Sequence, residues 1–197
     1  MASKTNELII RLANTKTDDS LFNPYNQICK NYDITTAPGL RQGNLRIYLD
    51  SYLNKKTDVL WVIDCADFYS AKLSGVPLLE PISYAKVEGI FGLTEHFEVA
   101  HKNRTISGSN KGNEEIWDLL SKQKTRPLIW NILPFYPHET EDISKRREPT
   151  KKEYLQHAEF IRLIISIFKP KTVLALGTKT QSVLKDLNIK SKVFSLN

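Results

Sequence analysis

Short apolar runs, each bounded by polar residues, prolines or glycines, recur along the chain. Runs of this length are typical of strands that are buried on both faces of a parallel sheet. We therefore predict strands in four segments: VLWVI (59–63), the first part of LIWNILPFYP (128–137), TVLALG (172–177) and KVFSLN (192–197).

Segments with the apolar spacing of a helix separate these runs. From Leu40 onward, apolar and aromatic residues recur three and four positions apart, whereas Arg41 and Arg46 fall on other sides of the predicted helix. The predicted buried face consists of Leu45, Tyr48, Leu49, Tyr52 and Leu53. The alternation of such helices with apolar strands predicts an α/β fold built on a mainly parallel sheet.

A second long helix is predicted to open at Thr150. Thr150 and Glu153 form the T-x-x-E pattern of a capping box, and Pro170 ends the helix after Lys169. Its predicted buried side consists of Leu155, Ala158, Ile161, Ile164, Ile165 and Phe168. The remaining predicted segments are two shorter helices, 113–123 and 178–188, and two long loops, 64–81 and 134–150.

Asn131 is a polar residue inside an otherwise apolar run. A buried amide without hydrogen-bond partners costs about 1–3 kcal/mol, so something must satisfy it. The partner is either the protein's own backbone or a ligand that presents both a donor and an acceptor. On the strand pattern alone, a core asparagine bonded to a neighbouring loop is the simpler interpretation.

Asp64 and Asp67 follow the strand predicted over 59–63. Loops at the carboxyl ends of parallel strands are where α/β proteins place their ligands, so both carboxylates are candidate functional groups. The structural alternative for either residue is a turn aspartate that caps loop amides.

Composition and charge narrow the function classes. The 197 residues suit a single domain, and a net charge of +6 with a pI near 9.2 is compatible with a polyanionic partner. Two cysteines make neither a disulfide framework nor a metal cluster, and the sequence has no phosphate-binding glycine loop. No apolar run has membrane-spanning length. We expect a cytoplasmic monomer without metal or cofactor.

Three motifs in a fixed order resemble the uracil-DNA glycosylase superfamily. They are the strand with its acidic loop and SGVP (59–77), WNILPFYPHE followed by RREPT (130–150), and FKPKTVLALGTKTQSVL (168–184). The branch that reads GEAPG…TGIPF, WNAFPFHPH…NRxPT and a V-x-A-x-G strand is the most similar. FNPY (22–25) and RQGNL (41–45) also fit, so the resemblance extends from about Phe22 to the end of the chain.

The resemblance implies a three-layer α/β/α sandwich around a short, four-stranded sheet, formed by one domain over 1–197 with 1–20 as an N-terminal extension. Such proteins bind DNA in a basic groove and extrude one nucleotide into a pocket at the carboxyl edge of the sheet. Asn131 then matches the family's base-reading asparagine, and Asp64 occupies the position of the glutamate in GEAPG, with Asp67 as the second candidate.

The motifs also depart from the family pattern. GEAPG is replaced by Ile63–Asp67, without its glycines and proline, and Leu78 stands where TGIPF has the aromatic residue that stacks on the flipped base. Tyr136 replaces the first histidine of HPH, and Arg146–Arg147 replaces the NR pair. The family's last motif, HPS or HPA, would follow Asn197, so it is absent or beyond the C-terminus.

These residues predict a monofunctional DNA glycosylase, in repair or antiviral defence, that excises a modified or damaged pyrimidine and leaves an abasic site. A bulky modified cytosine of phage DNA and uracil are the candidate bases. The predicted catalytic acids are Asp64 and Asp67; the base-binding residues are Asn131, Leu78, Phe68 and Tyr136; and the DNA-binding residues are Lys72, Lys145, Arg146, Arg147 and Lys179. The alternatives are a catalytically inactive homologue that binds DNA or a protein, and a nucleotide-binding α/β domain of another family.

Overall fold

The computed structural model describes residues 4–53, 55, 57–103 and 109–189. Its centre is a parallel sheet with the strand order β3-β2-β6. The strands of this sheet are β2 (Val59–Cys65), β3 (Leu128–Leu133) and β6 (Thr172–Ala175). Each of them lies where the apolar runs predict a strand, so the α/β class is confirmed.

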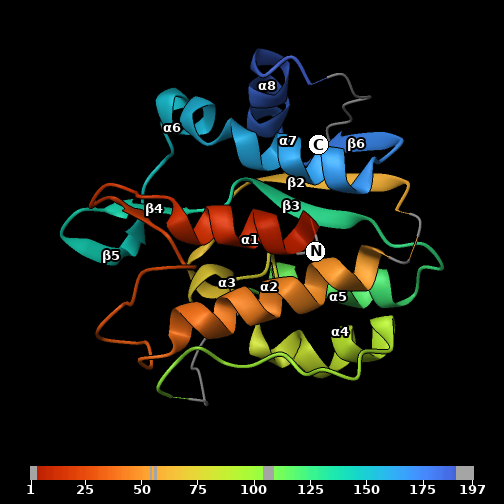
Figure 1. Ribbon diagram of the computed structural model, residues 1–197, viewed down its shortest axis with the longest axis horizontal. Helices are drawn as coiled ribbons and strands as arrows, with labels where there is room; N and C mark the ends of the chain where they lie inside the picture. The colour runs from red at the N-terminus through yellow and green to blue at the C-terminus, as the bar shows by residue number, and fades with distance from the viewer. Residues whose placement is uncertain (1–3, 54, 56, 104–108, 190–197) are drawn as a thin grey trace.

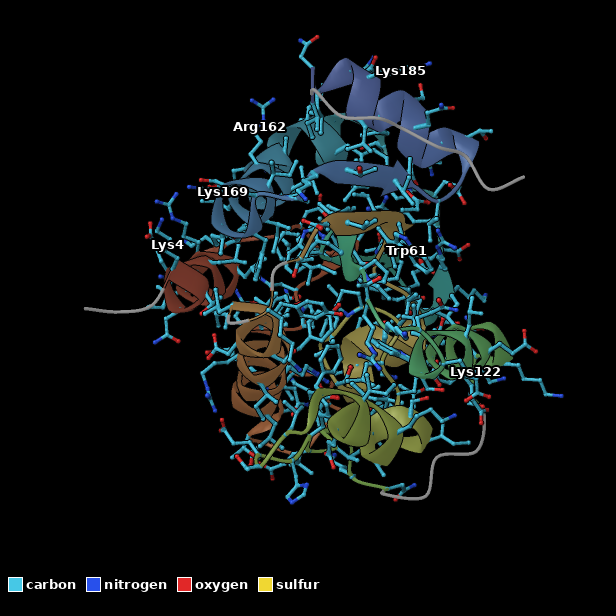
Figure 2. The ribbon with its side chains drawn as sticks, turned by 90° about the vertical axis from the view of Figure 1, so that its right-hand side faces the viewer. Lys4, Trp61, Lys122, Arg162, Lys169 and Lys185 are labelled. Atoms are coloured by element: carbon cyan, nitrogen blue, oxygen red, sulfur yellow. The ribbon has the colours of Figure 1, made fainter. Side chains whose placement is uncertain are left out.

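Helices cover both faces of the parallel sheet (Figure 1). One layer consists of α6 (Lys151–Gln156), α7 (Ala158–Phe168) and α8 (Thr178–Asp186). The other consists of α2 (Ala37–Leu53), α3 (Phe68–Leu73), α4 (Tyr84–Phe91) and α5 (Lys111–Ser121), with a short 3₁₀ helix, Pro81–Ser83, before α4. Helix α1 (Lys4–Asn14) packs against both α2 and α7. Figure 2 shows the two layers from the side, with the sheet between them.

The predicted four-stranded sheet is wrong for the described residues, which form two separate three-stranded sheets. The second sheet is antiparallel, and its strands are β1 (Leu21–Phe22), β4 (Tyr136–Glu139) and β5 (Asp142–Arg146). Strands β4 and β5 lie in the segment 134–150 that the sequence predicts as a loop. Strand β5 is mostly exposed and polar, so it carries no apolar pattern. The strand predicted over 192–197 lies outside the described residues.

The Thr150 capping box is confirmed, because the Thr150 hydroxyl accepts a hydrogen bond from Glu153 N and the Glu153 carboxylate accepts one from Thr150 N. The single long helix predicted behind it is wrong. The helix is interrupted at His157, whose φ and ψ are −106° and 13°, and splits into α6 and α7. As a result, Leu155 is not on the buried side and is 48% exposed.

Arg41 differs most from its prediction in α2. It is fully buried, although the apolar stripe placed it away from the core, whereas Leu53 at the end of the stripe is exposed. The Arg41 guanidinium donates to the Lys72 carbonyl at 2.6 and 2.8 Å and lies 2.6 Å from the Asp33 carboxylate. Arg41 therefore fixes the end of α3, the helix that follows Asp64 and Asp67.

Asn44, one turn further along α2, holds the chain just after α3. Its side-chain amide donates to the carbonyls of Ser74 and Glu98, at 3.0 and 2.8 Å, and its oxygen accepts from Glu98 N. The R-x-x-N pair of the RQGNL element is thus a structural clamp on the chain that leads from α3 to the SGVP turn.

Gly75 lies under this clamp, and its replacement by alanine is expected to destabilise the fold. Its φ is +71°, and an added Cβ would stand 2.6 Å from the Cβ of Arg41, which cannot move without shifting α2. Gly92 is the matched control, because its φ is +62° but an added Cβ meets nothing within 4 Å. Gly92→Ala should cost about 1 kcal/mol and Gly75→Ala clearly more, about 2–4 kcal/mol, in urea unfolding. Equal losses would contradict the close approach of Arg41.

No helix among the described residues is both long enough and apolar enough to span a membrane.

Candidate functional site

Asn131 lies in β3, beside Ile63 of β2, and is 5% exposed. Its Oδ1 atom is buried and has no hydrogen-bond partner among the residues that the structure describes. The simpler interpretation, a core asparagine bonded to a neighbouring loop, therefore leaves the acceptor unsatisfied. A buried acceptor without a partner, here in an edge strand of the parallel sheet, requires a hydrogen-bond donor that the described residues do not supply.

The pairing of β2 with β3 decides which side chains share a face. Side chains alternate along a strand, and neighbours in register point to the same side of the sheet. Asn131 therefore shares its face with Ile63 and Ile129. This face is the one toward α2 and α5, because Trp61, the register partner of Ile129, lines a cavity together with Tyr52 of α2 and Leu119 of α5.

Asp64 points to the opposite face of the sheet, because it follows Ile63 within β2. There it accepts hydrogen bonds from the Tyr154 hydroxyl of α6 and from Arg146 of β5, the latter at 3.2 Å, and Lys179 of α8 lies 3.5 Å away. Its carboxylate is 25% exposed and has two cations beside it. Asp64 thus joins four elements at the carboxyl edge of the sheet, on the side away from the Asn131 carboxamide.

Asp67 is the first residue before α3 and caps that helix. Its carboxylate accepts hydrogen bonds from Tyr69 N and Ser70 N, both at 3.0 Å, and from the Ser70 hydroxyl. Ala66 N donates to the Leu133 carbonyl, so the chain enters α3 directly beside the end of β3. Asp67 is therefore an aspartate that caps backbone amides, as the structural alternative predicted. It also stands at the strand end where ligands bind in α/β folds.

Phe68, the residue after Asp67, belongs to a small aromatic cluster. Its ring lies 5.7 Å from the Tyr136 ring and 6.2 Å from the Tyr32 ring, in edge-to-face geometries. Two of the predicted base-binding residues, Phe68 and Tyr136, are thus in contact, although they come from α3 and β4. Together with Tyr32 they form an aromatic wall near the carboxyl edge of the parallel sheet.

Lys72 is predicted to contact DNA from the loop 64–81, and this loop placement is wrong, because Lys72 lies in α3. The residue is 2% exposed, and its Nζ atom lies 3.3 and 3.7 Å from the ring centres of Tyr32 and Phe68. Burial lowers the pKa of its ammonium group to about 8. The buried ammonium group forms cation–π contacts with the Tyr32 and Phe68 rings and is not available to bind a phosphate.

Tyr136 is fully buried, and its hydroxyl has no hydrogen-bond partner among the described residues. Burial raises the pKa of this hydroxyl to about 12, so at neutral pH it keeps its proton and remains a donor. Its ring also stacks on His138, with 6.0 Å between the ring centres. Tyr136 and Asn131 are therefore two buried polar residues whose side-chain oxygens form no hydrogen bond with the described residues.

Leu78 does not join the aromatic wall and packs instead against the main core. Its φ of 57° lies in the left-handed region, which a leucine rarely occupies, and its carbonyl accepts a hydrogen bond from Trp117 Nε1 at 2.9 Å. The Ser74 hydroxyl, which donates to the Leu79 carbonyl, holds the same turn from below. The SGVPL turn is thus fixed by its backbone in a strained conformation.

The predicted DNA-binding cations differ in how closely each is paired with a carboxylate of the protein. Arg147 is bound to Glu153 at 2.5 Å and to Ser20. Burial raises the pKa of the Glu153 carboxyl, but the hydrogen bonds from Arg147 and Thr150 outweigh it and hold that pKa at about 2. Lys179 binds Glu148 as well as Asp64, and only Lys145 is largely exposed, with Asp142 no closer than 3.9 Å.

Tyr154 is a residue of this site that the sequence did not indicate. It is 2% exposed, and its hydroxyl donates to Asp64, while Lys179 lies 5.5 Å from its ring centre. A tyrosine in the first helical turns after a capping box has no special pattern, and only the tertiary contact with Asp64 reveals it. No group of three His, Cys, Asp or Glu residues in the described part of the chain has a geometry that would hold a metal ion.

A scan of the chain against models of protein families gives no match, and a search of curated protein sequences gives none either. Function is therefore inferred from the residues at the carboxyl edge of the sheet and from their geometry.

Proposed function

We propose that the protein is a monofunctional DNA glycosylase that excises a modified or damaged pyrimidine from a flipped-out nucleotide. The observation that carries this proposal is the Asn131 carboxamide, which is buried in the central sheet and whose oxygen has no partner among the described residues. A carboxamide presents one acceptor and two donors, and the Watson–Crick edge of a pyrimidine presents the complementary groups.

The aromatic wall supports the same assignment. A flipped base loses its stacking energy in the duplex. Stacking on an aromatic side chain in the pocket restores about 1–3 kcal/mol of that energy. Half-buried Phe68 provides such a face, and buried Tyr136 and Lys72 pack against its ring. Because Leu78 packs against the core, the stacking role that the family gives to this position passes in our proposal to Phe68.

The reaction breaks the bond between C1′ of the deoxyribose and the base nitrogen, and a bond to the oxygen of water replaces it. The base departs with the electron pair, so positive charge develops on the sugar and negative charge on the base. We assign Asp67 to the sugar side, because Asp64 lies on the opposite face of the sheet from Asn131 and has Arg146 and Lys179 beside it. Asp67 has no cation within ion-pair distance in the described part of the chain, and its carboxylate can accept a proton from the attacking water.

Tyr136 is assigned to the base side. A neutral donor aimed at the departing base stabilises the negative charge that develops on its oxygens. The hydroxyl of Tyr136 is protonated at neutral pH and has no protein partner in the described residues, so it is available for this role.

Tyr136→Phe is expected to lower base release about 10²-fold without destabilising the protein. The change removes only a buried hydroxyl that has no partner among the described residues, and such a loss is neutral or stabilising in unfolding experiments. Single-turnover base release and thermal unfolding, measured on the same preparation, check the two parts. A clear loss of stability would show that the hydroxyl has a partner within the fold, and an unchanged rate would remove Tyr136 from the mechanism.

The exposed cations at this edge are assigned to the DNA backbone. Lys145 and Arg146 stand on β5 and Lys179 on α8; Arg146 and Lys179 lie beside Asp64, and Lys145 is the most exposed of the three. Each phosphate contact contributes about −0.9 to the slope of log affinity against log salt concentration. Arg147 is left out of this set, because Glu153 and Ser20 already bind it.

Release of free base from a panel of DNA substrates tests the proposal. The panel contains uracil, 5-hydroxymethyluracil, 5-hydroxymethylcytosine and DNA isolated from phages with modified cytosine, in single-stranded and duplex form. We expect release of one modified or damaged pyrimidine and formation of an alkali-labile abasic site. Intact glycosidic bonds in every substrate would overturn the enzymatic proposal.

A second candidate function is a catalytically inactive homologue that binds DNA. One observation favours it: Asp64 is engaged in ion pairs, and Asp67 is engaged as a helix cap. This function predicts salt-dependent DNA binding that survives the loss of both carboxylates and no base release from any member of the panel.

A further inference from the structure

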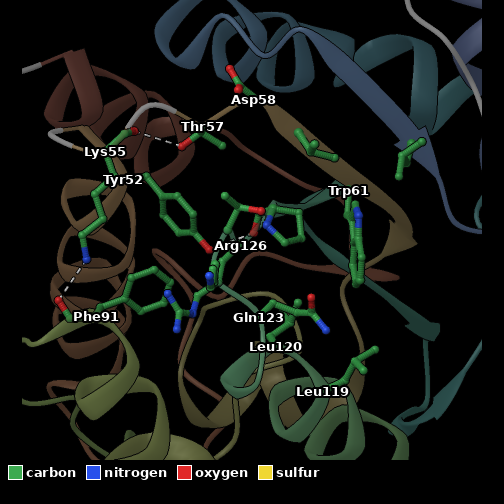
Figure 3. Close-up of a pocket in the computed structure, with 15 residues that line it drawn as sticks. Tyr52, Lys55, Thr57, Asp58, Trp61, Phe91, Leu119, Leu120, Gln123 and Arg126 are labelled. Atoms are coloured by element: carbon green, nitrogen blue, oxygen red, sulfur yellow. Dashed lines mark hydrogen bonds between the residues drawn. The ribbon is translucent and has the colours of Figure 1, made fainter.

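A cavity of about 610 Å³ lies at the other end of the parallel sheet, where β2 and β3 begin (Figure 3). Its described lining comes from the end of α2, from α5, from Arg126 and Pro127 just before β3, and from one face of β2 and β6. The carboxyl ends of the same strands carry Asp64 and Asn131, so this cavity is separate from the proposed glycosylase site. Its volume lies in the range of small-molecule sites.

Aromatic rings form opposite sides of the cavity. Figure 3 shows Trp61 on one side and Tyr52 and Phe91 on the other, with Arg126 between them. The Tyr52 hydroxyl donates to the Pro127 carbonyl, so the residue offers its ring and not its polar end. Trp61 is only half-buried, because the cavity lies over its face of the sheet, and Leu119 on α5 is 52% exposed.

The charge of the cavity is positive. Lys55, Lys124 and Arg126 line it, and the one acidic residue of the described lining, Asp58, is paired with Lys171 outside it. Lys55 is occupied, since it donates to the Phe91 carbonyl and lies over the Phe91 ring. Arg126 is different: its Nε atom is buried, and it forms no hydrogen bond or ion pair with the described residues.

We propose that this cavity binds a small planar aromatic anion, a carboxylate or a phosphate ester, with its ring against Trp61 and its anionic group on Arg126. An unpaired guanidinium with a buried N–H is a costly arrangement that an anion relieves by charge-assisted hydrogen bonds. The flat indole face supplies stacking at the same time. A neutral aromatic molecule would leave Arg126 unpaired, and an aliphatic anion would leave the three rings uncovered.

Calorimetric titration of the full chain tests this assignment with three probes. 2-Naphthoate and 1-naphthyl phosphate carry both the ring and the anion, and 2-naphthalenemethanol carries the ring alone. We expect the two anions to bind at least about tenfold more tightly than the alcohol, and Arg126→Gln to weaken both by about tenfold or more while leaving the alcohol unchanged. Lys122→Gln, at the exposed end of α5 and outside the cavity lining (Figure 2), is the matched control for the loss of one positive charge.

The position of the ring is tested by the NMR signal of the Trp61 indole N–H, identified by its absence in Trp61→Leu. This signal should shift when 2-naphthoate is added to the wild-type protein and to Lys122→Gln. If Trp61→Leu does not fold, the responsive indole signal is identified by its nuclear Overhauser contacts with Leu119 and Leu174. Equal affinity of anion and alcohol, no loss of affinity in Arg126→Gln, no binding of any probe, or a tryptophan signal that does not respond would each overturn the proposal.

Discussion

Asp67→Asn is expected to lower the rate of base release by about 10²–10⁴-fold. The substitution removes the carboxylate that we assign to the deoxyribose and the attacking water. It leaves the cap of α3 in place, because the oxygen of an asparagine side chain accepts from Tyr69 N and Ser70 N as the carboxylate does. The rate is measured in single-turnover base release on the substrate that the panel identifies, and circular dichroism shows that the fold is retained.

Asp64→Asn is the matched control for this experiment. It makes the same chemical change three residues earlier, on the opposite face of the sheet, and removes the charge that faces Arg146 and Lys179. The Tyr154 hydroxyl still finds an acceptor in the new side chain. We expect base release to stay within about tenfold of wild type. If Asp64→Asn abolished release and Asp67→Asn did not, the assignment of the acid would be reversed.

Arg41→Met is expected to destabilise the protein by about 3–5 kcal/mol. Methionine fills the same space, but it leaves the fully buried Asp33 carboxylate without its cation. It also removes both donors to the Lys72 carbonyl. The midpoint of urea unfolding measures the loss. Because Arg41 holds the end of α3, the variant should also bind substrate DNA more weakly than its remaining folded fraction predicts.

Arg46→Met, on the same helix, is the control. Arg46 is more exposed and pairs with Glu95 at 2.5 Å on the surface, where such ion pairs contribute about 0–1 kcal/mol. Its replacement should therefore move the unfolding midpoint only slightly. A similar loss for Arg41 and Arg46 would mean that the buried pair of Arg41 and Asp33 does not have the role that its burial indicates.

The apolar pattern predicted the central strands well because burial on both faces requires nearly unbroken apolar runs. Strands β2, β3 and β6 and the capping box of α6 are all local features that the sequence states directly. Strands β4 and β5 are not, since β5 is mostly exposed and polar, with Ile143 as its one apolar residue, and it pairs with β4. A strand with a single partly buried apolar residue carries too little pattern to be recognised.

The charged residues of the site were harder to predict for a physical reason. Arg41 and Lys72 look like surface residues, but carbonyl groups and a carboxylate surround the first, and two aromatic rings hold the second. Both environments form only when segments far apart in the chain meet. Sequence alone therefore assigned Lys72 to the DNA and Arg41 to an outer side of its helix.

The orientations of Asp64 and Asp67 depend on where β2 ends. The sequence predicted that β2 stops at Ile63, which would have placed Asp64 in a loop beside Asn131. In the structure β2 continues to Cys65, so alternation turns Asp64 to the far face and leaves Asp67 as the first acid beyond the strand. Asn131, in contrast, could be singled out from the sequence, because a polar group in a buried strand always needs a partner.

Base release by Asn131→Leu, measured beside its DNA affinity and its thermal stability, tests the central claim most directly. Leucine matches the shape of asparagine and removes an oxygen that has no partner in the described residues, so the protein should be as stable as wild type or more stable. DNA affinity, which depends mainly on phosphate contacts, should change little, while base release falls about 10²-fold. Release at the wild-type rate from a stable Asn131→Leu protein would contradict the reading of the flipped base by Asn131.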